Sequence, residues 1–208
     1  MSTNSPAFVI TVSGISGSGK SSTVRAIAER PGNAACFYFD DYGEARQQPG
    51  DGLQWIAEGA NLKAFTLPQF GRDIKKLRQG ETVVTPVGRR VESASFLVIE
   101  EPFGGGREDM AGLVDFSVCI EAPMEVALAR RLLDVVERWE GEAAPRLQWI
   151  GNYLNTYLFE GMREVYAAIN ERVRENSNLI LDGTLPVEQN ARWVAEAVLQ
   201  KQVQREKQ

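Results

Sequence analysis

Histidine is absent from this 208-residue chain, and cysteine occurs only twice. The lack of histidine excludes a histidine general base and a histidine-bound zinc ion, so any proton acceptor is expected to be a carboxylate. Cys36 and Cys119 each lie in an apolar stretch. This placement predicts two buried free thiols in a reduced compartment rather than a disulfide framework.

The chain also lacks a long apolar run and an excess of basic residues. No apolar stretch approaches the roughly 18 residues that a membrane helix needs. The net charge of -5 argues against a general nucleic-acid binder. The segment Met1–Pro6 is short and polar, unlike a signal peptide. We therefore expect a cytoplasmic protein with neither nucleic-acid nor membrane partners, and the sequence leaves a homo-oligomer open.

Strand-like and helix-like segments alternate along the chain. Short apolar runs predict strands at Phe8–Val12, Ala35–Phe39, Phe96–Ile99, Phe116–Ile120 and Leu179–Leu181. Helical spacing predicts helices at Ser21–Arg30, Leu53–Ala60, Pro68–Gln79, Pro123–Trp139, Leu147–Glu175 and from Pro186 onward. Residues 41–52 are expected to form a loop, and Thr82–Pro86 a short extended piece. The alternation predicts one α/β domain over residues 1–208, with a five-stranded, mostly parallel sheet and helices on both faces.

A phosphate-binding loop is the strongest functional signal. Gly14-Ile-Ser-Gly-Ser-Gly-Lys-Ser21 fits G-x-x-x-x-G-K-[ST], with a predicted strand before it and a helix after it. Glycines let backbone N–H groups face phosphate oxygens, and the helix N-terminus favours the same anion. We predict that ATP is bound by Gly14, Ser16, Gly17, Ser18, Gly19, Lys20, Ser21 and Ser22. Lys20 would bridge the β- and γ-phosphates, and the Ser21 hydroxyl would ligate Mg²⁺. The alternative is an accidental glycine-rich turn.

Carboxylates follow two of the predicted strands, at the edge where parallel sheets bind ligands. Asp40 would serve as a general base that takes a proton from an acceptor hydroxyl, or alternatively cap the next turn. Capping suits Asp41 equally well. Glu100 ends the strand Phe96–Ile99 and is a candidate ligand of Mg²⁺ or of a water bound to it, and Glu101 is its nearest competitor.

Arginines cluster in a predicted lid over about residues 130–150. Arg130 and Arg131 would stabilise charge on a transferring phosphoryl group, with Arg138 and Arg146 as further candidates. The alternative is a set of exposed arginines paired with acids on their own helix. Arg89 and Arg90 could bind an anion, but a solvated loop is the favoured interpretation.

In order along the chain, these motifs resemble the uridine kinase and phosphoribulokinase family of P-loop kinases, which includes nicotinamide riboside kinases. The resemblance covers about residues 8–200. It is carried by Ile15–Ser21, Phe39-Asp40-Asp41-Tyr42, Val98-Ile99-Glu100, Leu128-Ala129-Arg130-Arg131 and Leu181-Asp182-Gly183-Thr184. It implies a three-layer P-loop NTPase fold with a helical lid. It also implies that Asp40 is the catalytic base, that Asp41 and Tyr42 lie at the acceptor, and that Glu100 serves the metal.

By this resemblance the protein is expected to transfer the γ-phosphate of ATP to a hydroxyl of a nucleoside, riboside or similar small molecule. The sequence departs from the family at Glu101-Pro102, where a glycine is usual, and at Leu132-Leu133-Asp134, where a further arginine is common. The acid that grips ribose hydroxyls has no clear match, and Glu58 is a candidate. The alternatives are a nucleotide-binding switch or hydrolase, although the chain has no N-K-x-D motif, and a non-catalytic relative.

Overall fold

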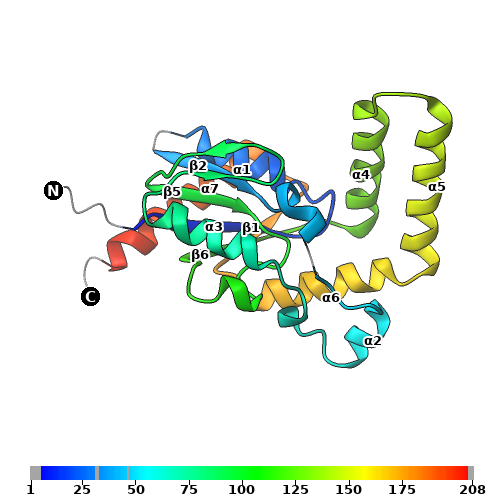
Figure 1. Cartoon of the computed structure of the whole chain (residues 1–208), viewed down its shortest axis with the longest axis horizontal. Helices are drawn as coiled ribbons and strands as arrows, with labels where there is room; N and C mark the ends of the chain where they lie inside the picture. The colour runs from blue at the N-terminus through cyan, green and yellow to red at the C-terminus, as the bar shows by residue number, and fades with distance from the viewer. Residues whose placement is uncertain (1–5, 31–32, 46, 206–208) are drawn as a thin grey trace.

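The computed structural model describes residues 6–30, 33–45 and 47–205 (Figure 1). The strands are β1 (Phe8–Ser13), β2 (Ala34–Tyr38), β3 (Val83–Val84), β4 (Arg90–Val91), β5 (Phe96–Glu100), β6 (Phe116–Glu121) and β7 (Leu179–Asp182). The α-helices are α1 (Lys20–Ala28), α2 (Gly52–Ala57), α3 (Pro68–Arg78), α4 (Met124–Arg138), α5 (Ala143–Phe159), α6 (Met162–Glu175) and α7 (Val187–Arg205). The 3₁₀ turns are η1 (Phe39–Ala45), η2 (Leu62–Ala64) and η3 (Glu108–Met110).

A five-stranded parallel sheet in the order β2-β5-β1-β6-β7 forms the centre of the fold. Its inner strands are apolar runs because both of their faces are buried, as parallel sheets require. The register pairs Val12 of β1 with Glu100 of β5, and Glu100 with Tyr38 of β2. The carboxyl ends of these three strands therefore meet at one edge, where the loops that follow them are brought together.

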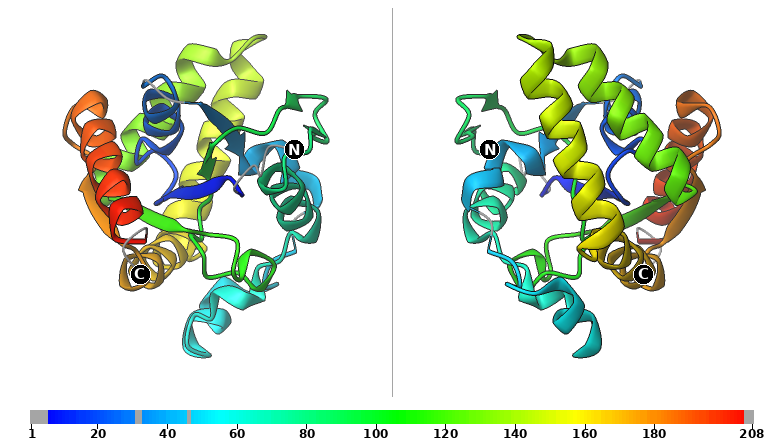
Figure 2. Two further views of the ribbon diagram at one scale, coloured as in Figure 1. Left: turned by 90° about the vertical axis from the view of Figure 1, so that its left-hand side faces the viewer. Right: turned by 90° about the vertical axis from the view of Figure 1, so that its right-hand side faces the viewer.

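Two apolar layers lie on opposite faces of the sheet. One buries side chains of α1 and α7, including Val24 and Val194, against alternate residues of β1 such as Ile10. The other buries side chains of α3 and α6, including Ile74 and Val173, against Val9. Figure 2 shows helices on both sides of the sheet. The predicted three-layer P-loop NTPase fold, with its mostly parallel five-stranded sheet, is confirmed.

The prediction of one helix over Leu147–Glu175 is wrong in one respect. The structure has two helices there, α5 and α6, separated by a turn at Gly161. Gly161 has a φ of +81°, and a Cβ there would lie 2.8 Å from the Leu53 side chain. A left-handed residue ends an α-helix and lets the chain change direction. α5 therefore stands beside α4 as a helical hairpin projecting from the body, whereas α6 runs back along the body (Figure 1).

Three smaller differences concern the connecting segments. Within the expected loop 41–52, most of the first part continues the 3₁₀ turn η1, and residue 46 lies outside the described residues. The extended piece near Val83 pairs with Val91 in an antiparallel hairpin of β3 and β4. Both cysteines are free: Cys119 is buried as predicted, while Cys36 is only partly buried.

The α4–α5 hairpin contains the segment predicted as a lid and is longer, from Met124 to Phe159. Its α4 arm begins directly after β6, at the edge of the sheet that carries the phosphate-loop motif. None of the helices in the described part of the chain has both the length and the apolar character that crossing a bilayer requires.

Candidate functional site

The phosphate-loop motif forms the turn between β1 and α1. Gly17 has a φ of +83°, and a Cβ at this position would lie 2.0 Å from the backbone oxygen of Ala127 in α4. Only glycine can satisfy both the left-handed backbone and this close approach. The loop therefore packs directly against the start of the helical hairpin. All of the residues predicted to bind ATP except Ser18 line a cleft of about 880 Å³, and Ser18 is buried beneath the loop.

Lys20 is the first residue of α1 and reaches back over the loop. Its Nζ donates a hydrogen bond to the Ile15 oxygen at 3.1 Å and lies 3.9 Å from Glu100 Oε1. Burial lowers the pKa of Lys20, while the negative charges of Glu100 and Asp40 raise it. The buried ammonium group of Lys20 can bind an anion such as a phosphate. The two carboxylates beside it favour a cation, so the site as a whole suits a phosphate with a bound metal ion.

Asp40 is exposed, lies in η1 directly after β2, and lines the same cleft as Lys20. The structure thus brings together three segments that are far apart in sequence: the phosphate loop, the turn after β2 and the end of β5. This geometry meets one requirement for Asp40 as a base, which is access to the cleft that would hold both substrates. Its role in catalysis stays a prediction.

Asp41 and Tyr42 do not line the cleft, contrary to the predicted acceptor site. The buried Asp41 carboxylate lies 3.3 Å from Arg89 Nη2. The Tyr42 ring is packed against two phenylalanines of the core, and its hydroxyl donates a hydrogen bond to Asp73 at 2.9 Å. Burial, together with that hydrogen bond, raises the pKa of Tyr42. Both side chains hold η1 in place, whereas the neighbouring Asp40 lines the cleft.

The structure separates Glu100 from Glu101, which the sequence left as competitors. Glu100 lines the cleft beside Lys20. Glu101 is fully buried on the other face of the sheet, where it accepts hydrogen bonds from Arg107 at 2.9 Å and from the Phe103 backbone at 3.0 Å. Burial raises the pKa of Glu101 to about 7, although Arg107 opposes the shift. Glu100 is therefore the carboxylate that can reach a metal ion in the cleft.

The chemistry of Ser21 and Glu100 fits a magnesium ion. Both residues line the cleft and supply hard oxygen donors, the kind of ligand that Mg²⁺ prefers. Within the described residues, no group of three or more acidic or thiol side chains is arranged to hold a metal ion. Two protein oxygens are compatible with Mg²⁺ in nucleotide sites, since its other ligands are usually phosphate oxygens and water.

Arg130 and Arg131 both line the cleft, on α4. Arg130 donates a hydrogen bond to the Gly183 oxygen at 2.7 Å, which ties α4 to the turn after β7. The Arg131 guanidinium lies 5.3 Å from the centroid of the Trp149 ring on α5. Arg138 also lines the cleft and forms a 2.7 Å ion pair with Asp134. Arg146 does not line the cleft, and its guanidinium donates a hydrogen bond to the Val136 oxygen. Both arms of the hairpin thus set the positions of cleft arginines.

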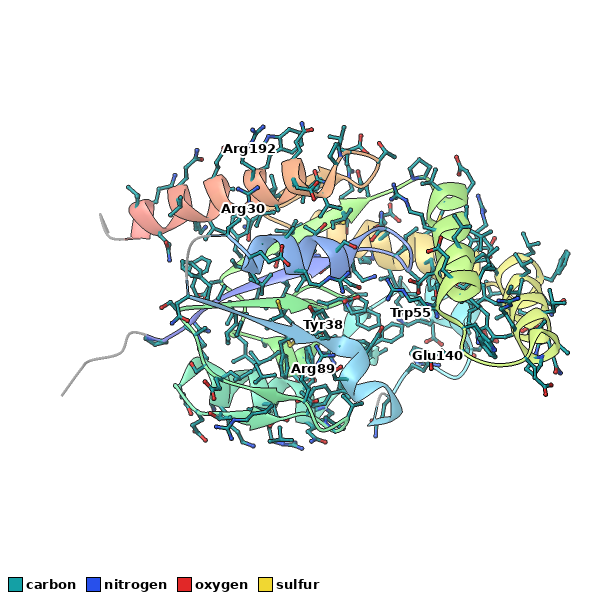
Figure 3. The ribbon with its side chains drawn as sticks, turned by 90° about the horizontal axis from the view of Figure 1, so that it is seen from above. Arg30, Tyr38, Trp55, Arg89, Glu140 and Arg192 are labelled. Atoms are coloured by element: carbon teal, nitrogen blue, oxygen red, sulfur yellow. The ribbon has the colours of Figure 1, made fainter. Side chains whose placement is uncertain are left out.

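Arg89 has a structural role that the sequence interpretation as a solvated loop missed. Besides its ion pair with Asp41, its guanidinium lies 4.7 Å from the centre of the Tyr38 ring. Figure 3 shows Arg89 and Tyr38 next to each other at the edge of the sheet. Arg90 is solvated as expected and pairs with Glu92. Glu58, the candidate for gripping a ribose, is bonded to Gln54 and does not line the cleft.

The turn Asp182-Gly183-Thr184 lies beside the phosphate loop, since a Cβ on Gly183 would be 2.9 Å from the Ser18 oxygen. Asp182 accepts hydrogen bonds from the backbone and the hydroxyl of Thr184, which lower its pKa. The resemblance to the uridine kinase family implies that this turn passes near the adenine of ATP, which stays a prediction. A second hollow of about 860 Å³ between η2 and the end of α6 contains none of the predicted site residues.

Among the remaining cleft residues, only Arg25 could have been found from a local pattern. Arg25 lies four residues beyond Ser21, so helical spacing places it on the same side of α1 as the loop. The others come from segments without a phosphate-loop or strand-end motif, and only the fold brings them together. They include Gln48, Trp55, Phe65, Phe103, Thr156, Glu160, Met162, Val165, Tyr166 and Ile169.

Known structures share this fold. A candidate fructose transport system kinase from Silicibacter sp. TM1040 aligns with a TM-score of 0.50 and 15% identity over 84% of this chain and 89% of that chain. A shikimate kinase from Acinetobacter baumannii, solved with shikimate, aligns at 0.49 with 14% identity over 94% and 95% of the two chains. A candidate uridine kinase from Bacillus stearothermophilus aligns at 0.46 with 14% identity over 85% and 89%.

No protein-family model and no curated protein matches the sequence. At about 15% identity the structural likeness indicates the fold alone, so the resemblance to the uridine kinase family is not confirmed as membership. The protein therefore has a P-loop NTPase fold, with its cleft at the carboxyl edge of the parallel sheet.

Proposed function

We propose that this protein is an ATP- and magnesium-dependent kinase that phosphorylates a hydroxyl group of a small molecule such as a nucleoside or riboside. The observation that carries the proposal is the joint placement of Lys20, Asp40 and Glu100 around one cleft. The cleft extends past Asp40 to a region lined by α2 and α6, which offers room for an acceptor beside the nucleotide. A nucleotide switch does not need such a second compartment.

Each group would have a distinct part in the transfer. Backbone N–H groups of the loop and Lys20 would hold the β- and γ-phosphates, and Arg130 and Arg131 would offset charge on the transferring group. Ser21 and Glu100 would hold Mg²⁺. The ion, when bound, would neutralise negative charge on the phosphate oxygens. Asp40 would orient the acceptor hydroxyl and accept its proton as the new O–P bond forms.

The test is magnesium-dependent ATP consumption by the full chain, measured with and without a panel of nucleosides, ribosides and simple polyols. Acceptor-dependent turnover in the wild type is expected to fall at least about 100-fold in Asp40→Asn, with little change in ATP affinity. Asp51→Asn is the matched control, because Asp51 caps α2 outside the cleft lining and asparagine also caps helices.

Two results would contradict the proposal. Tight ATP binding with no acceptor-stimulated turnover across the panel would favour a non-catalytic relative. ATP hydrolysis that is insensitive to acceptors and to Asp40→Asn would favour a switch or hydrolase.

A further inference from the structure

A column of three aromatic rings runs along α5. It consists of Trp149, Tyr153 and Tyr157, which are four residues apart and therefore lie on one side of the helix. The ring centroids of Trp149 and Tyr153 are 5.0 Å apart, and those of Tyr153 and Tyr157 are 6.4 Å apart. None of these three residues lines the cleft. The column is thus a feature of the hairpin to which the proposed reaction assigns no part.

One end of the column is anchored in the body of the protein. Tyr157 is buried, and its ring meets that of Tyr166 on α6 edge to face, with 6.3 Å between the centroids. α6 is fixed to the sheet in turn, because Ile169 and Val173 are buried in one of the two core layers. Packed interiors of this kind are rigid. The column therefore extends the rigid body into α5, across the turn at Gly161.

The other end of the column meets Arg131 of α4, which lines the cleft. The guanidinium carbon of Arg131 lies 5.3 Å from the centroid of the Trp149 ring, within the range of a cation–π contact. Figures 1 and 2 both show α4 and α5 side by side. Asp134 also approaches Arg131, but at 3.7 Å, and its other oxygen forms the 2.7 Å ion pair with Arg138. Trp149 is therefore a main support of the Arg131 guanidinium.

An aromatic ring holds a guanidinium differently from a carboxylate. It carries no net charge, so it does not cancel the positive charge, and the N–H groups that face away from it stay available for phosphate oxygens. The charge of Arg131 does reach the cleft: burial lowers the pKa of Lys20, and the positive charge of Arg131 lowers it further. Arg130 differs, since its guanidinium donates a hydrogen bond to the Gly183 oxygen. Arg131 is thus the better placed of the two to bind an additional phosphate.

We propose that Trp149 is a positioning residue for Arg131, and that the aromatic column holds this arginine ready for the terminal phosphate of the bound nucleotide. Because the column fixes the guanidinium in advance, less conformational entropy is lost when the phosphate is contacted. The contact favours ATP over ADP, which lacks that phosphate. The inference rests on the proposed function, since it takes ATP as the phosphate donor.

The experiment measures, by calorimetric titration of the full chain with magnesium, the Kd of ADP and the Kd of a non-hydrolysable ATP analogue. The ratio of the ADP value to the analogue value reports contacts made only to the terminal phosphate. In Trp149→Leu we expect this ratio to fall by about two- to fivefold, the size of a partly exposed cation–π contact. Trp149→Phe keeps a ring beside Arg131, so its ratio should fall less.

A double-mutant cycle with Arg131→Met separates positioning from a merely structural role. Arg131→Met should lower the ratio at least as much as Trp149→Leu, and the double variant should show no further fall, because Trp149 acts only through this arginine. If Trp149→Leu fails to fold, Trp149→Phe takes its place in the cycle. Trp139→Leu is the matched control, since Trp139 is also half-buried on the hairpin, at the C-cap of α4, and does not line the cleft. Its ratio should equal that of the wild type.

An unchanged ratio in Trp149→Leu would overturn the proposal. An equal fall in Trp139→Leu would also overturn it, as would effects of Trp149→Leu and Arg131→Met that simply add. The titrations contain no acceptor, so their result does not depend on phosphoryl transfer. The expected coupling in a protein without acceptor-stimulated turnover would support the positioning role and count against the kinase. Acceptor-stimulated turnover with an unchanged ratio in Trp149→Leu would support the kinase and overturn the positioning role.

Discussion

Arg107 is the most deeply buried cation of the described chain, and its replacement by methionine gives a quantitative test of how the cleft is supported. The side chain is 1% exposed, with Nη2 2.9 Å from Glu101 Oε2 and Nη1 3.1 Å from Asp109 Oδ2. Its guanidinium also lies 5.5 Å from the ring centroids of Phe39 and Phe70. Arg107 therefore joins the end of β5, η3, η1 and α3, and it lies beside Phe39, which lines the cleft.

Methionine retains most of the volume but leaves Glu101 and Asp109 without a counter-ion. Breaking a buried pair by removing one partner costs about 3–5 kcal/mol of unfolding free energy, because a buried charge stays uncompensated. For a domain of this length each kcal/mol corresponds to roughly 2–4 °C, so we expect Tm to fall by roughly 6–20 °C.

The cost should depend on pH, since Glu101 can escape part of it by binding a proton. Burial raises the pKa of Glu101 from 4.5 to about 7 in the folded protein. A carboxyl with a raised folded pKa contributes stability that is complete below the unfolded pKa and is lost as pH rises through the folded pKa. Without Arg107 the folded pKa rises further. The destabilisation should therefore be larger at pH 8 than at pH 6, by up to about 1.4 kcal/mol per pH unit.

The assay is urea unfolding followed by tryptophan fluorescence at both pH values, with Arg90→Met as the control. Arg90 also pairs with a glutamate, but both side chains are solvent-exposed, so its loss should cost less than about 1 kcal/mol. A cost for Arg107→Met as small as that of the control would refute the argument. A cost that is larger at pH 6 than at pH 8 would refute the part assigned to Glu101.

The remaining predictions concern the phosphate loop and the turn after β2. Gly17→Ala should abolish tight nucleotide binding and lower Tm more than Gly19→Ala, as measured by titration and thermal unfolding. The reason is that a Cβ at Gly17 meets the Ala127 backbone, whereas a Cβ at Gly19 meets no atom within 4 Å. Arg89→Met leaves the buried Asp41 unpaired, so acceptor-dependent kcat should fall severalfold with an unchanged ATP affinity. An equal loss of ATP affinity would contradict this positioning role.

The parts of the fold that could be predicted are those determined by residues close together in the sequence. The run from Phe8 is β-branched and apolar, and it ends at the glycines of the loop, so its strand and the following turn could be predicted locally. The break at Gly161 could not, because glycine is tolerated within helices and only the contact with Leu53, from a distant segment, requires a turn there. The pairing of Arg89 with Asp41 likewise depends on long-range packing.

Glu100 and Glu101 illustrate where local and long-range information meet. Neighbouring residues of a strand point to opposite faces, so the sequence establishes only that the two acids diverge. The parallel register resolves which one faces the nucleotide, since it places Val98 beside Ile10, in the apolar layer of α1. Glu100 is two residues beyond Val98, so it lies on the same face of the sheet and reaches Lys20, the first residue of α1. Glu101 lies on the opposite face and pairs with Arg107. A strand-end carboxylate in such folds can therefore be assigned once the strand that carries the phosphate loop is aligned with its neighbour.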